Sequence, residues 1–235
     1  MQPGLWTIFR TRWQDTRSRK SRYQSIKEVG ADIWEFLMES TPQRYRARFG
    51  DLEYDWDHPG ANTTAATVTT RTRLLAAIAG APYQASEPTL FREMVRSLNI
   101  DFRQFTYVDI GSGKGRTLLM AAEMGFRRAV GVELLPELHQ VALENIAASG
   151  YGNVESECVD GRDYQFPDEP LVVYLFNPLP AAALAQCIEN LRKSLAERPR
   201  PVKIIYHNPI SEDVLSTASF LKKIHSTYQY AIYSN

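Results

Sequence analysis

The sequence predicts an α/β fold built on a doubly wound, mostly parallel sheet, and three observations support this. From Phe105 onward, short apolar runs alternate regularly with helical patterns. Such alternation implies parallel strands joined by right-handed crossovers. The first apolar run leads directly into a glycine-rich turn and a helical pattern, Asp109-Ile-Gly-Ser-Gly-Lys-Gly115. The chain closes on two adjacent strand-like runs, at 220–226 and 228–234, which bring the expected number of strands to seven.

The elements of this sheet follow in order along the chain. A helix is expected over 89–98, because apolar residues at 90, 91, 94, 95 and 98 have the spacing of a helix that lies on a sheet. The parallel strands are expected near 105–110, 128–133, 154–159, 171–176 and 202–207. The helices between and after them are expected near 114–125, 136–148, 181–196 and 211–217.

The first fifty residues differ from the rest, because ten Lys and Arg residues face five acids and aromatic residues interleave with them. We expect one or two amphipathic helices there, with the aromatic residues packed on the α/β domain. The alternative is a basic surface for an acidic macromolecule. Turn residues over 51–73 predict a loop that covers the substrate or simply connects. The expected domains are therefore a helical extension with a covering loop, 1–73, and the α/β domain, 74–235.

Composition narrows the function classes. The 27 basic residues equal the 27 acidic ones, so no global field indicates nucleic acid or an anionic membrane. Cys158 and Cys187 are too few for a disulfide framework and lack the spacing of metal ligands, so we expect no metal. No apolar run approaches the roughly 18–20 residues of a membrane span. The amino terminus lacks a signal pattern, and we expect a cytoplasmic protein.

The glycine turn and the end of the second strand predict a cofactor. Glycine at 111, 113 and 115 allows positive φ and a close approach of backbone to ligand. Glu133, at the tip of the second strand, can accept hydrogen bonds from two ribose hydroxyls. The spacing is not that of a phosphate-binding P-loop, and a dinucleotide turn needs glycine where Arg116 stands. Asp109 would repel a pyrophosphate but attract the cationic groups of S-adenosylmethionine (SAM).

This segment also carries a resemblance. Asp109-x-Gly111-x-Gly113-x-Gly115 resembles motif I of class I (Rossmann-like) SAM-dependent methyltransferases, and residues from about 80 to 235 look like a complete domain of that family. FTYVDIGSGKGRTLLMAAEMGFRRAVGVELLPELHQVALENI resembles a largely uncharacterised bacterial group. It is more loosely similar to non-SET histone lysine methyltransferases and to the lysine methyltransferase of an ATP synthase subunit. The resemblance implies an antiparallel hairpin at the end of the sheet.

The resemblance also implies the cofactor contacts. Asp109 would lie behind the methionine amino group, and the turn from Gly111 through Ser112 and Gly113 to Gly115 would pass along the methionine and the ribose. Glu133 would hold the ribose hydroxyls, and Leu134 would pack on the adenine.

Further contacts have alternatives. Asp160 matches the acid that receives the adenine amino group, with Asp163 as the second choice and a turn cap as the structural alternative for either. Tyr83 and Gln84 precede the first strand, where related enzymes place residues near the cofactor. Lys114 would screen nearby acids or lie exposed to solvent, and Arg116 could pair with an acid of the amino-terminal segment.

The fourth strand ends in Asn177-Pro178-Leu179-Pro180, the position of motif IV in the family. Asn177 and Pro178 are the predicted catalytic residues, because the Asn side chain and the carbonyl before proline can both accept hydrogen bonds from an amine, and proline fixes their geometry. Enzymes of the family that methylate planar nitrogen substrates typically carry an aromatic residue two places after the first proline. In this sequence that position is Pro180. His207 could line the substrate cavity, although a structural role is the more common one.

These residues predict a SAM-dependent methyltransferase that acts on nitrogen in a protein, at a lysine-like amine, or in a small molecule. We do not expect a nucleic-acid acceptor. The alternative is a SAM-binding regulatory or assembly protein without catalysis. A nicotinamide-dependent oxidoreductase would need glycine at 116 and would lack Asp109. The oligomeric state does not follow from the sequence.

Overall fold

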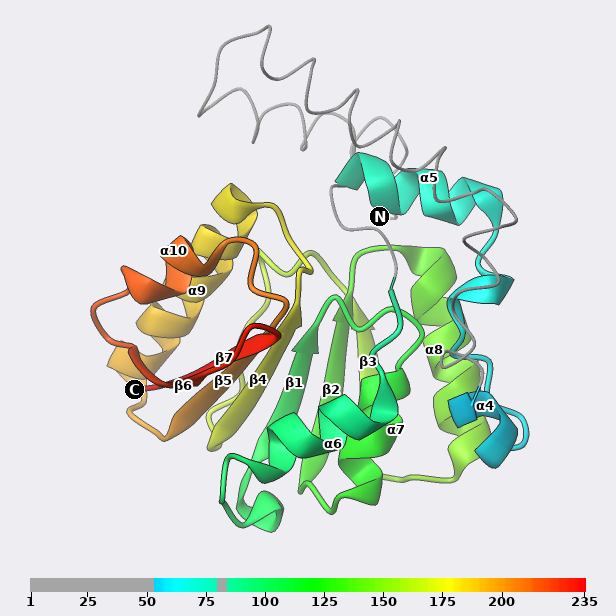
Figure 1. Ribbon diagram of the computed structural model, residues 1–235, viewed down its shortest axis with the longest axis horizontal. Helices are drawn as coiled ribbons and strands as arrows, with labels where there is room; N and C mark the ends of the chain where they lie inside the picture. The colour runs from blue at the N-terminus through cyan, green and yellow to red at the C-terminus, as the bar shows by residue number, and fades with distance from the viewer. Residues whose placement is uncertain (1–52, 80–83) are drawn as a thin grey trace, which may run out of the picture.

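A seven-stranded sheet organises the computed structural model, which describes residues 53–79 and 84–235. The strand order is β3-β2-β1-β4-β5-β7-β6 (Figure 1). The first five strands run parallel, and β7 pairs antiparallel with both β5 and β6. The strands are β1 (Thr106–Ile110), β2 (Arg128–Glu133), β3 (Val154–Cys158), β4 (Leu171–Phe176), β5 (Val202–His207), β6 (Lys222–Ser226) and β7 (Tyr230–Ser234). The predicted fold class, with its antiparallel closing hairpin, is confirmed.

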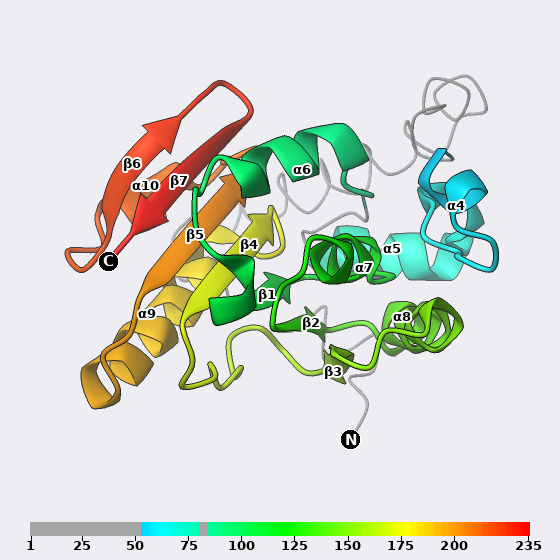
Figure 2. The same cartoon turned by 90° about the horizontal axis from the view of Figure 1, so that it is seen from below.

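Helices cover both faces of this sheet. One face carries α6 (Pro88–Arg96), α7 (Arg116–Glu123) and α8 (Pro136–Ser149), and the other carries α9 (Ala181–Glu197) and α10 (Glu212–Ser216). Figure 2 shows α6 and α7 on the side of the sheet opposite α9. A short turn, η3 (Phe102–Gln104), leads into β1. The helical extension predicted for residues 1–50 lies outside the described residues.

Strand β1 shows how the two layers fix side-chain directions. All five of its residues are buried, as expected for a parallel strand covered on both faces. Tyr107 packs in the core beneath α6 and α7, whereas Val108 and Ile110 pack in the core beneath α9. Because successive side chains of a strand alternate, Asp109 points toward the α7 side, at the carboxyl end of the strand.

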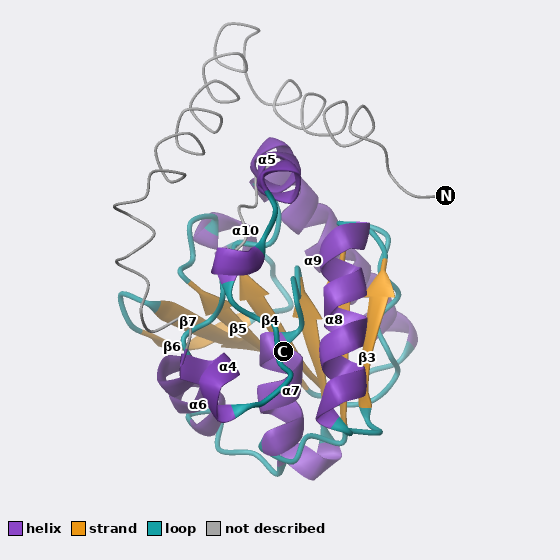
Figure 3. Ribbon diagram, turned by 90° about the vertical axis from the view of Figure 1, so that its right-hand side faces the viewer, coloured by secondary structure: helices purple, strands orange, loops and turns teal. Residues whose placement is uncertain are grey.

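The described part of the loop predicted over 51–73 contains helices, and the last of them continues to residue 79. The helices are α4 (Glu53–Asp57), η2 (Ala65–Thr67) and α5 (Thr70–Ala79), so the expected boundary between residues 73 and 74 falls inside α5. Figures 1 and 3 show α5 lying across the carboxyl ends of the strands. Its Leu75 and Ala76 share a core cluster with Leu135 and Leu138 beside the start of α8. This helix therefore covers one end of the sheet.

Lys114 attaches the α4–α5 segment to the glycine turn. The lysine was expected to screen acids or to face solvent, but it is 2% exposed. Its ammonium donates to the Thr64 carbonyl at 2.8 Å, to Asn62 Oδ1 at 3.2 Å and to the hydroxyl of Thr67. A buried ammonium needs such acceptors to offset its lost hydration, and only the folded segment brings them to residue 114. The solvent-exposed reading was wrong.

Replacing Lys114 with methionine should therefore destabilise the protein. We expect the free energy of unfolding to fall by about 1–3 kcal/mol, because the buried acceptors lose their charged donor. Denaturant unfolding monitored by circular dichroism measures this. The matched control is Lys193→Met on the exposed face of α9, for which we expect a change within about 0.5 kcal/mol. Equal effects of the two substitutions would contradict the buried role of Lys114.

None of the helices formed by residues 53–79 and 84–235 combines the length and apolarity that a bilayer crossing requires. Within the same ranges, no cluster of three or more His, Cys, Asp or Glu side chains is arranged as metal ligands.

Candidate functional site

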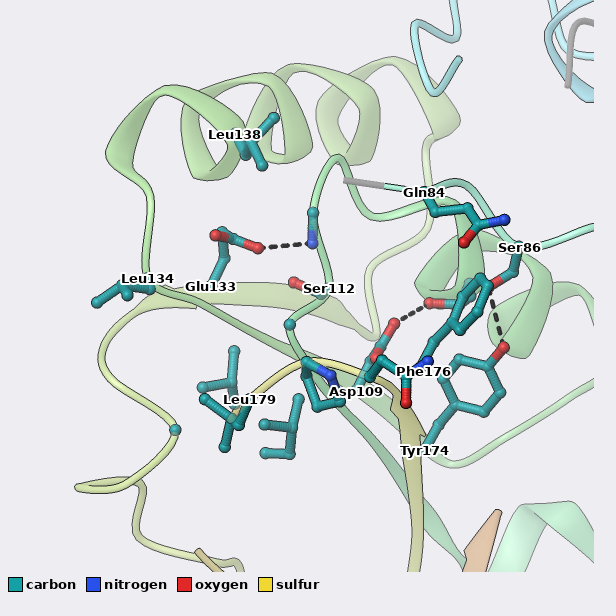
Figure 4. A pocket seen from close by; sticks show the side chains of 18 of the residues that line it. Gln84, Ser86, Asp109, Ser112, Glu133, Leu134, Leu138, Tyr174, Phe176 and Leu179 are labelled. Carbon is teal, nitrogen blue, oxygen red and sulfur yellow. Dashed lines mark hydrogen bonds between the residues drawn. The ribbon is translucent and has the colours of Figure 1, made fainter. Parts of the chain in front are cut away.

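A cavity opens at the carboxyl ends of β1, β2 and β4. The strand order reverses between β1 and β4, and open α/β sheets bind their ligands at such a switch point. The cavity and its mouth hold about 910 Å³ of empty space, part of it open to solvent. Most of the predicted site residues line it together: Asp109, Gly111, Ser112, Gly113, Glu133, Leu134, Asn177 and Pro178. Figure 4 shows this wall from close by.

The glycine turn makes the floor of the cavity. Gly111, Gly113 and Gly115 have φ of +81°, +56° and +81°, in the left-handed region that favours glycine. A Cβ on Gly111 would lie 2.6 Å from Cβ of Pro178, so the turn and motif IV touch at this point. Gly115 does not line the cavity but caps the amino end of α7, and a Cβ there would lie 3.4 Å from Cβ of Ala142 in α8.

Glu133 stands at the end of β2 with its carboxylate buried. One oxygen accepts a hydrogen bond from the Gly113 amide at 2.8 Å (Figure 4). The other accepts one from the Leu135 amide, also at 2.8 Å. Burial raises the pKa of this carboxyl to about 7, although the backbone amides oppose the shift. Each carboxylate oxygen has a further lone-pair direction, so the group can still receive a pair of hydroxyl donors.

Asp109 presents a second buried carboxylate, at the end of β1. It is 3% exposed and accepts a hydrogen bond from the Thr117 hydroxyl. Burial raises its pKa to about 7, and the charge of Glu133 adds to the shift. A cation beside this carboxylate would offset the cost of its burial. The site is therefore suited to an ammonium group.

Ser112 offers an independent test of whether the cavity suits a polar ligand. Its hydroxyl is buried and lacks a hydrogen-bond partner in the part of the chain that the structure describes. A Cβ on Gly131 would come within 2.5 Å of this oxygen, so glycine at 131 leaves the room that Ser112 occupies. Buried hydroxyls in native proteins are normally paired. A polar ligand in the cavity would supply the partner, and together with the two acids this fits a nucleoside that carries an amino acid, such as SAM.

Motif IV forms the wall opposite Glu133. Asn177 follows β4 with φ of +46°, and its side-chain oxygen accepts a 3.4 Å hydrogen bond from the Ile210 amide. Pro178 and Leu179 line the cavity, and Pro180 is the N-cap residue of α9. Left-handed backbone at a residue other than glycine costs free energy and often marks a functional position.

Asp160, the predicted adenine contact, does not face the cavity as expected. Asp160 does not line the cavity, because its carboxylate accepts hydrogen bonds from the backbone amide and the guanidinium of Arg162 in its own turn. The turn-cap alternative describes this geometry. The neighbouring Gly161 makes the wall instead, and a Cβ on it would lie 2.9 Å from Ile110. Asp163 is exposed. Tyr83 lies outside the described residues, whereas Gln84 lines the cavity.

Sequence reasoning missed several wall residues, among them Ser86 and Tyr174. The Ser86 hydroxyl and the Tyr174 hydroxyl are 2.9 Å apart, and Tyr174 is 2.8 Å from Nδ1 of His207. His207 stacks on Phe176 at 4.0 Å, and burial lowers the pKa of His207 to about 4. These contacts favour a structural role for His207 over the alternative that it lines the substrate cavity. A buried tyrosine in an apolar strand was the available signal, because its hydroxyl must find a partner.

Comparison with known proteins shows which proteins this chain is similar to. Residues 108–198 match the family model described as a methyltransferase domain. A search of the curated proteins found no match. Among solved structures, an RNA methyltransferase from Salinibacter ruber in complex with S-adenosyl-L-homocysteine is 22% identical with a TM-score of 0.45, covering 65% of this chain and 92% of that one. A SAM-dependent methyltransferase from Aquifex aeolicus is 16% identical with a TM-score of 0.47, covering 63% and 98%.

The ribosomal protein L11 methylase from Lactobacillus delbrueckii subsp. bulgaricus is 20% identical with a TM-score of 0.43, covering 63% of this chain and 74% of that one. The looser resemblance to non-SET lysine methyltransferases is not confirmed by these matches. The domain match spans the glycine turn, Glu133 and motif IV, the same segments that build the cavity. The chain thus contains a segment, residues 108–198, that matches a methyltransferase domain and forms much of the cavity.

Proposed function

We propose that the chain is a SAM-dependent methyltransferase that acts on an amine nitrogen, either a lysine-like amine of a protein or the amine of a small molecule. The observation that carries the proposal is the Asn177-Pro178 pair in the cavity wall. When SAM is bound, it supplies an electrophilic methyl group. The contribution of the chain is to place the acceptor nitrogen, and positioning of this kind can supply roughly 7–11 kcal/mol.

Asn177 has the groups that such placement requires. Its side-chain oxygen and its backbone carbonyl are both acceptors for N–H donors, and the backbone carbonyl precedes a proline that restricts its motion. The hydrogen bond that the side-chain oxygen accepts from Ile210 is 3.4 Å long, at the weak end of the range. An amine can replace it at little cost. Contact with Gly111 fixes Pro178 relative to the cofactor turn.

The surroundings favour a compact amine over a planar base. Pro180 stands where nitrogen-methylating enzymes with planar substrates carry an aromatic residue, and it is the N-cap residue of α9. Phe176 lines the cavity, but His207 stacks on it with an interplanar angle of 20°, which occupies one face of its ring. Leu179 adds an aliphatic side chain to the cavity wall. An aliphatic amine fits these groups.

The acceptor amine must lose a proton, because an unperturbed lysine has a pKa near 10.4. Transfer of the ammonium into a partly buried cavity lowers that pKa. Burial raises the pKa of the Tyr174 hydroxyl, and burial lowers the pKa of His207 to about 4. Neither group is a strong base at neutral pH. We therefore propose that desolvation of the amine, by lowering its pKa, accounts for the loss of the proton.

Transfer from methyl-labelled SAM tests the acceptor class. We expect label in protein from cell extract or in a small amine, and with unlabelled SAM the same acceptor should gain about 14 Da per methyl group by mass spectrometry. Label found only in RNA would overturn the amine proposal in favour of a nucleic-acid acceptor. Binding of SAM without any transfer would favour the alternative, a regulatory or assembly protein that does not catalyse.

Asn177→Ala should separate catalysis from binding. We expect kcat/KM to fall about 10²–10³-fold, the size of effect seen when a preorganised polar contact to the reacting centre is removed. Affinity for S-adenosylhomocysteine should fall by less than about tenfold. The matched control is Asn99→Ala, an exposed residue with φ of +49° that lies outside the cavity. An equal loss of activity in both variants would mean that backbone strain, and not the amide, explains the effect.

A further inference from the structure

Two neighbouring strands are followed by the same pair of residues. Asn177-Pro178 follows β4, and Asn208-Pro209 follows β5. The strands lie side by side and pair in parallel register up to their last residues, so the two pairs leave the sheet at the same level (Figure 1). Both asparagines have left-handed backbone, with φ of +46° and +48°, which costs free energy for a residue other than glycine. The first pair lines the cavity, whereas the second does not.

Hydrogen bonds hold the second turn beside motif IV. The Asn208 amide donates to the Gln229 carbonyl at 2.6 Å, and the Ile210 amide donates to the Asn208 carbonyl at 2.9 Å. The Ile210 amide also reaches Asn177 Oδ1, at 3.4 Å. Gln229 belongs to the turn between β6 and β7, so this turn stands at the same edge of the sheet. Because these bonds fix the backbone, a partner can bind here with little further ordering.

The side chains on these two turns are exposed. Asn208 faces solvent, and its side-chain amide has no hydrogen-bond partner among the residues that the structure describes. Ile210 is 76% exposed, and Tyr228, on the turn between β6 and β7, is 91% exposed. Single exposed apolar residues are common on protein surfaces. Here two of them accompany an unpaired amide next to Asn177, and the combination indicates a binding surface for the part of an acceptor that extends beyond the cavity.

The charges near this surface favour a peptide over a nucleic acid. Glu212 and Asp213 follow shortly after the turn, and Asp213 is exposed. Lys and Arg are absent from the sequence between Lys203 and Lys222, and Lys223 pairs with Glu212 at 2.9 Å. Much of the affinity of proteins for nucleic acids comes from Lys and Arg contacts to phosphate. An exposed acid instead attracts a segment that carries a lysine ammonium.

We propose that Asn208, Ile210 and Tyr228 bind the polypeptide on either side of the methylated amine, so that the acceptor is a protein and not a small molecule. This inference rests on the proposed function and names its substrate class. A small amine fits within the cavity, whereas a lysine side chain is attached to a backbone that must stay outside it. The Asn208 amide can both donate to and accept from that backbone. Ile210 and Tyr228 supply apolar contacts to a neighbouring side chain.

Methyl transfer into a fractionated cell extract tests the acceptor class. The full chain and methyl-labelled SAM are incubated with extract, which is then separated into protein, RNA and low-molecular-mass fractions. We expect label in the protein fraction, in material that protease digests. Label only in the low-molecular-mass fraction would overturn the inference while the amine proposal stands. Label only in RNA, or no label at all, would reject the proposed function and this inference with it.

Two variants test the residues themselves. Asn208→Gly removes the amide and keeps a residue suited to φ of +48°. Ile210→Ala removes an exposed apolar side chain. At limiting extract, we expect the initial rate of protein labelling to fall about 3–10-fold in each, the value of one hydrogen bond or a small apolar contact. The loss should shrink at high extract, because these contacts act on the affinity for the acceptor.

Matched controls separate docking from folding. Asn99→Gly changes an exposed asparagine with φ of +49°, and Leu143→Ala changes an exposed apolar residue of α8. Both should label protein at the wild-type rate. Wild-type labelling by either Asn208→Gly or Ile210→Ala would overturn the inference. Calorimetry with S-adenosylhomocysteine completes the test, because an equal loss of labelling rate and of this affinity would assign the two residues a purely structural role.

Discussion

Gly111→Ala is expected to abolish binding of S-adenosylhomocysteine and to destabilise the protein by several kcal/mol. The added Cβ would lie 2.6 Å from Cβ of Pro178 and 3.2 Å from its Cα, and φ is +81° at this position. Left-handed backbone alone costs about 1–2 kcal/mol for a residue with a Cβ. The contact adds to this, because Pro178 is rigid and cannot rotate away. Relief requires the cofactor turn and motif IV to separate.

Gly125→Ala isolates the cost of placing a residue with a Cβ in left-handed backbone. Gly125 has φ of +86°, but a Cβ there would meet no atom within 4 Å. This variant should therefore lose only about 1–2 kcal/mol and keep its affinity for S-adenosylhomocysteine. Denaturant unfolding and calorimetry measure the two quantities. If Gly111→Ala behaved like Gly125→Ala in both, contact between the turn and Pro178 would not define the site.

Asp109→Asn is expected to stabilise the ligand-free protein at pH 8 while weakening SAM binding at least 10-fold. Burial raises the pKa of Asp109 from 3.8 to about 7, so the folded state favours the protonated carboxyl. That stabilisation is complete below pH of about 4 and is lost as the pH rises through about 7. Three pKa units correspond to roughly 4 kcal/mol. The neutral amide avoids this cost but provides no charge for an ammonium.

The pH dependence makes this prediction specific. The stability advantage of Asp109→Asn should be largest at pH 8 and should shrink as the pH falls toward 4. In the wild type, affinity for S-adenosylhomocysteine should rise between pH 5.5 and 8 as the buried acids ionise. The variant should keep only the part of that rise due to Glu133, whose pKa burial also raises to about 7. Asp57→Asn, at an exposed residue of α4, serves as the control. A pH-independent difference between variant and wild type would contradict the assignment.

The sequence by itself determined the sheet, the glycine turn and the position of Glu133. These features depend on local rules that a short window contains. Apolar periodicity separates strands from helices, glycine permits the φ of +81° at position 111, and a proline is the N-cap residue of α9 after β4. The acids at the ends of β1 and β2 follow, because parallel strands bring their carboxyl ends to one edge.

Tertiary structure alone decided the surroundings of Lys114 and Arg116. The acceptors of Lys114, and the Thr63 hydroxyl that accepts from Arg116, come from about fifty residues earlier in the chain, and no local pattern specifies such contacts. The loop expected over 51–73 became α4, η2 and the start of α5 because buried cations at the glycine turn hold it there. Asp160 fits its motif in sequence, but a competing guanidinium two residues away takes its carboxylate. Local chemistry sets which elements form, whereas the free energy of burying a charge depends on which distant groups surround it.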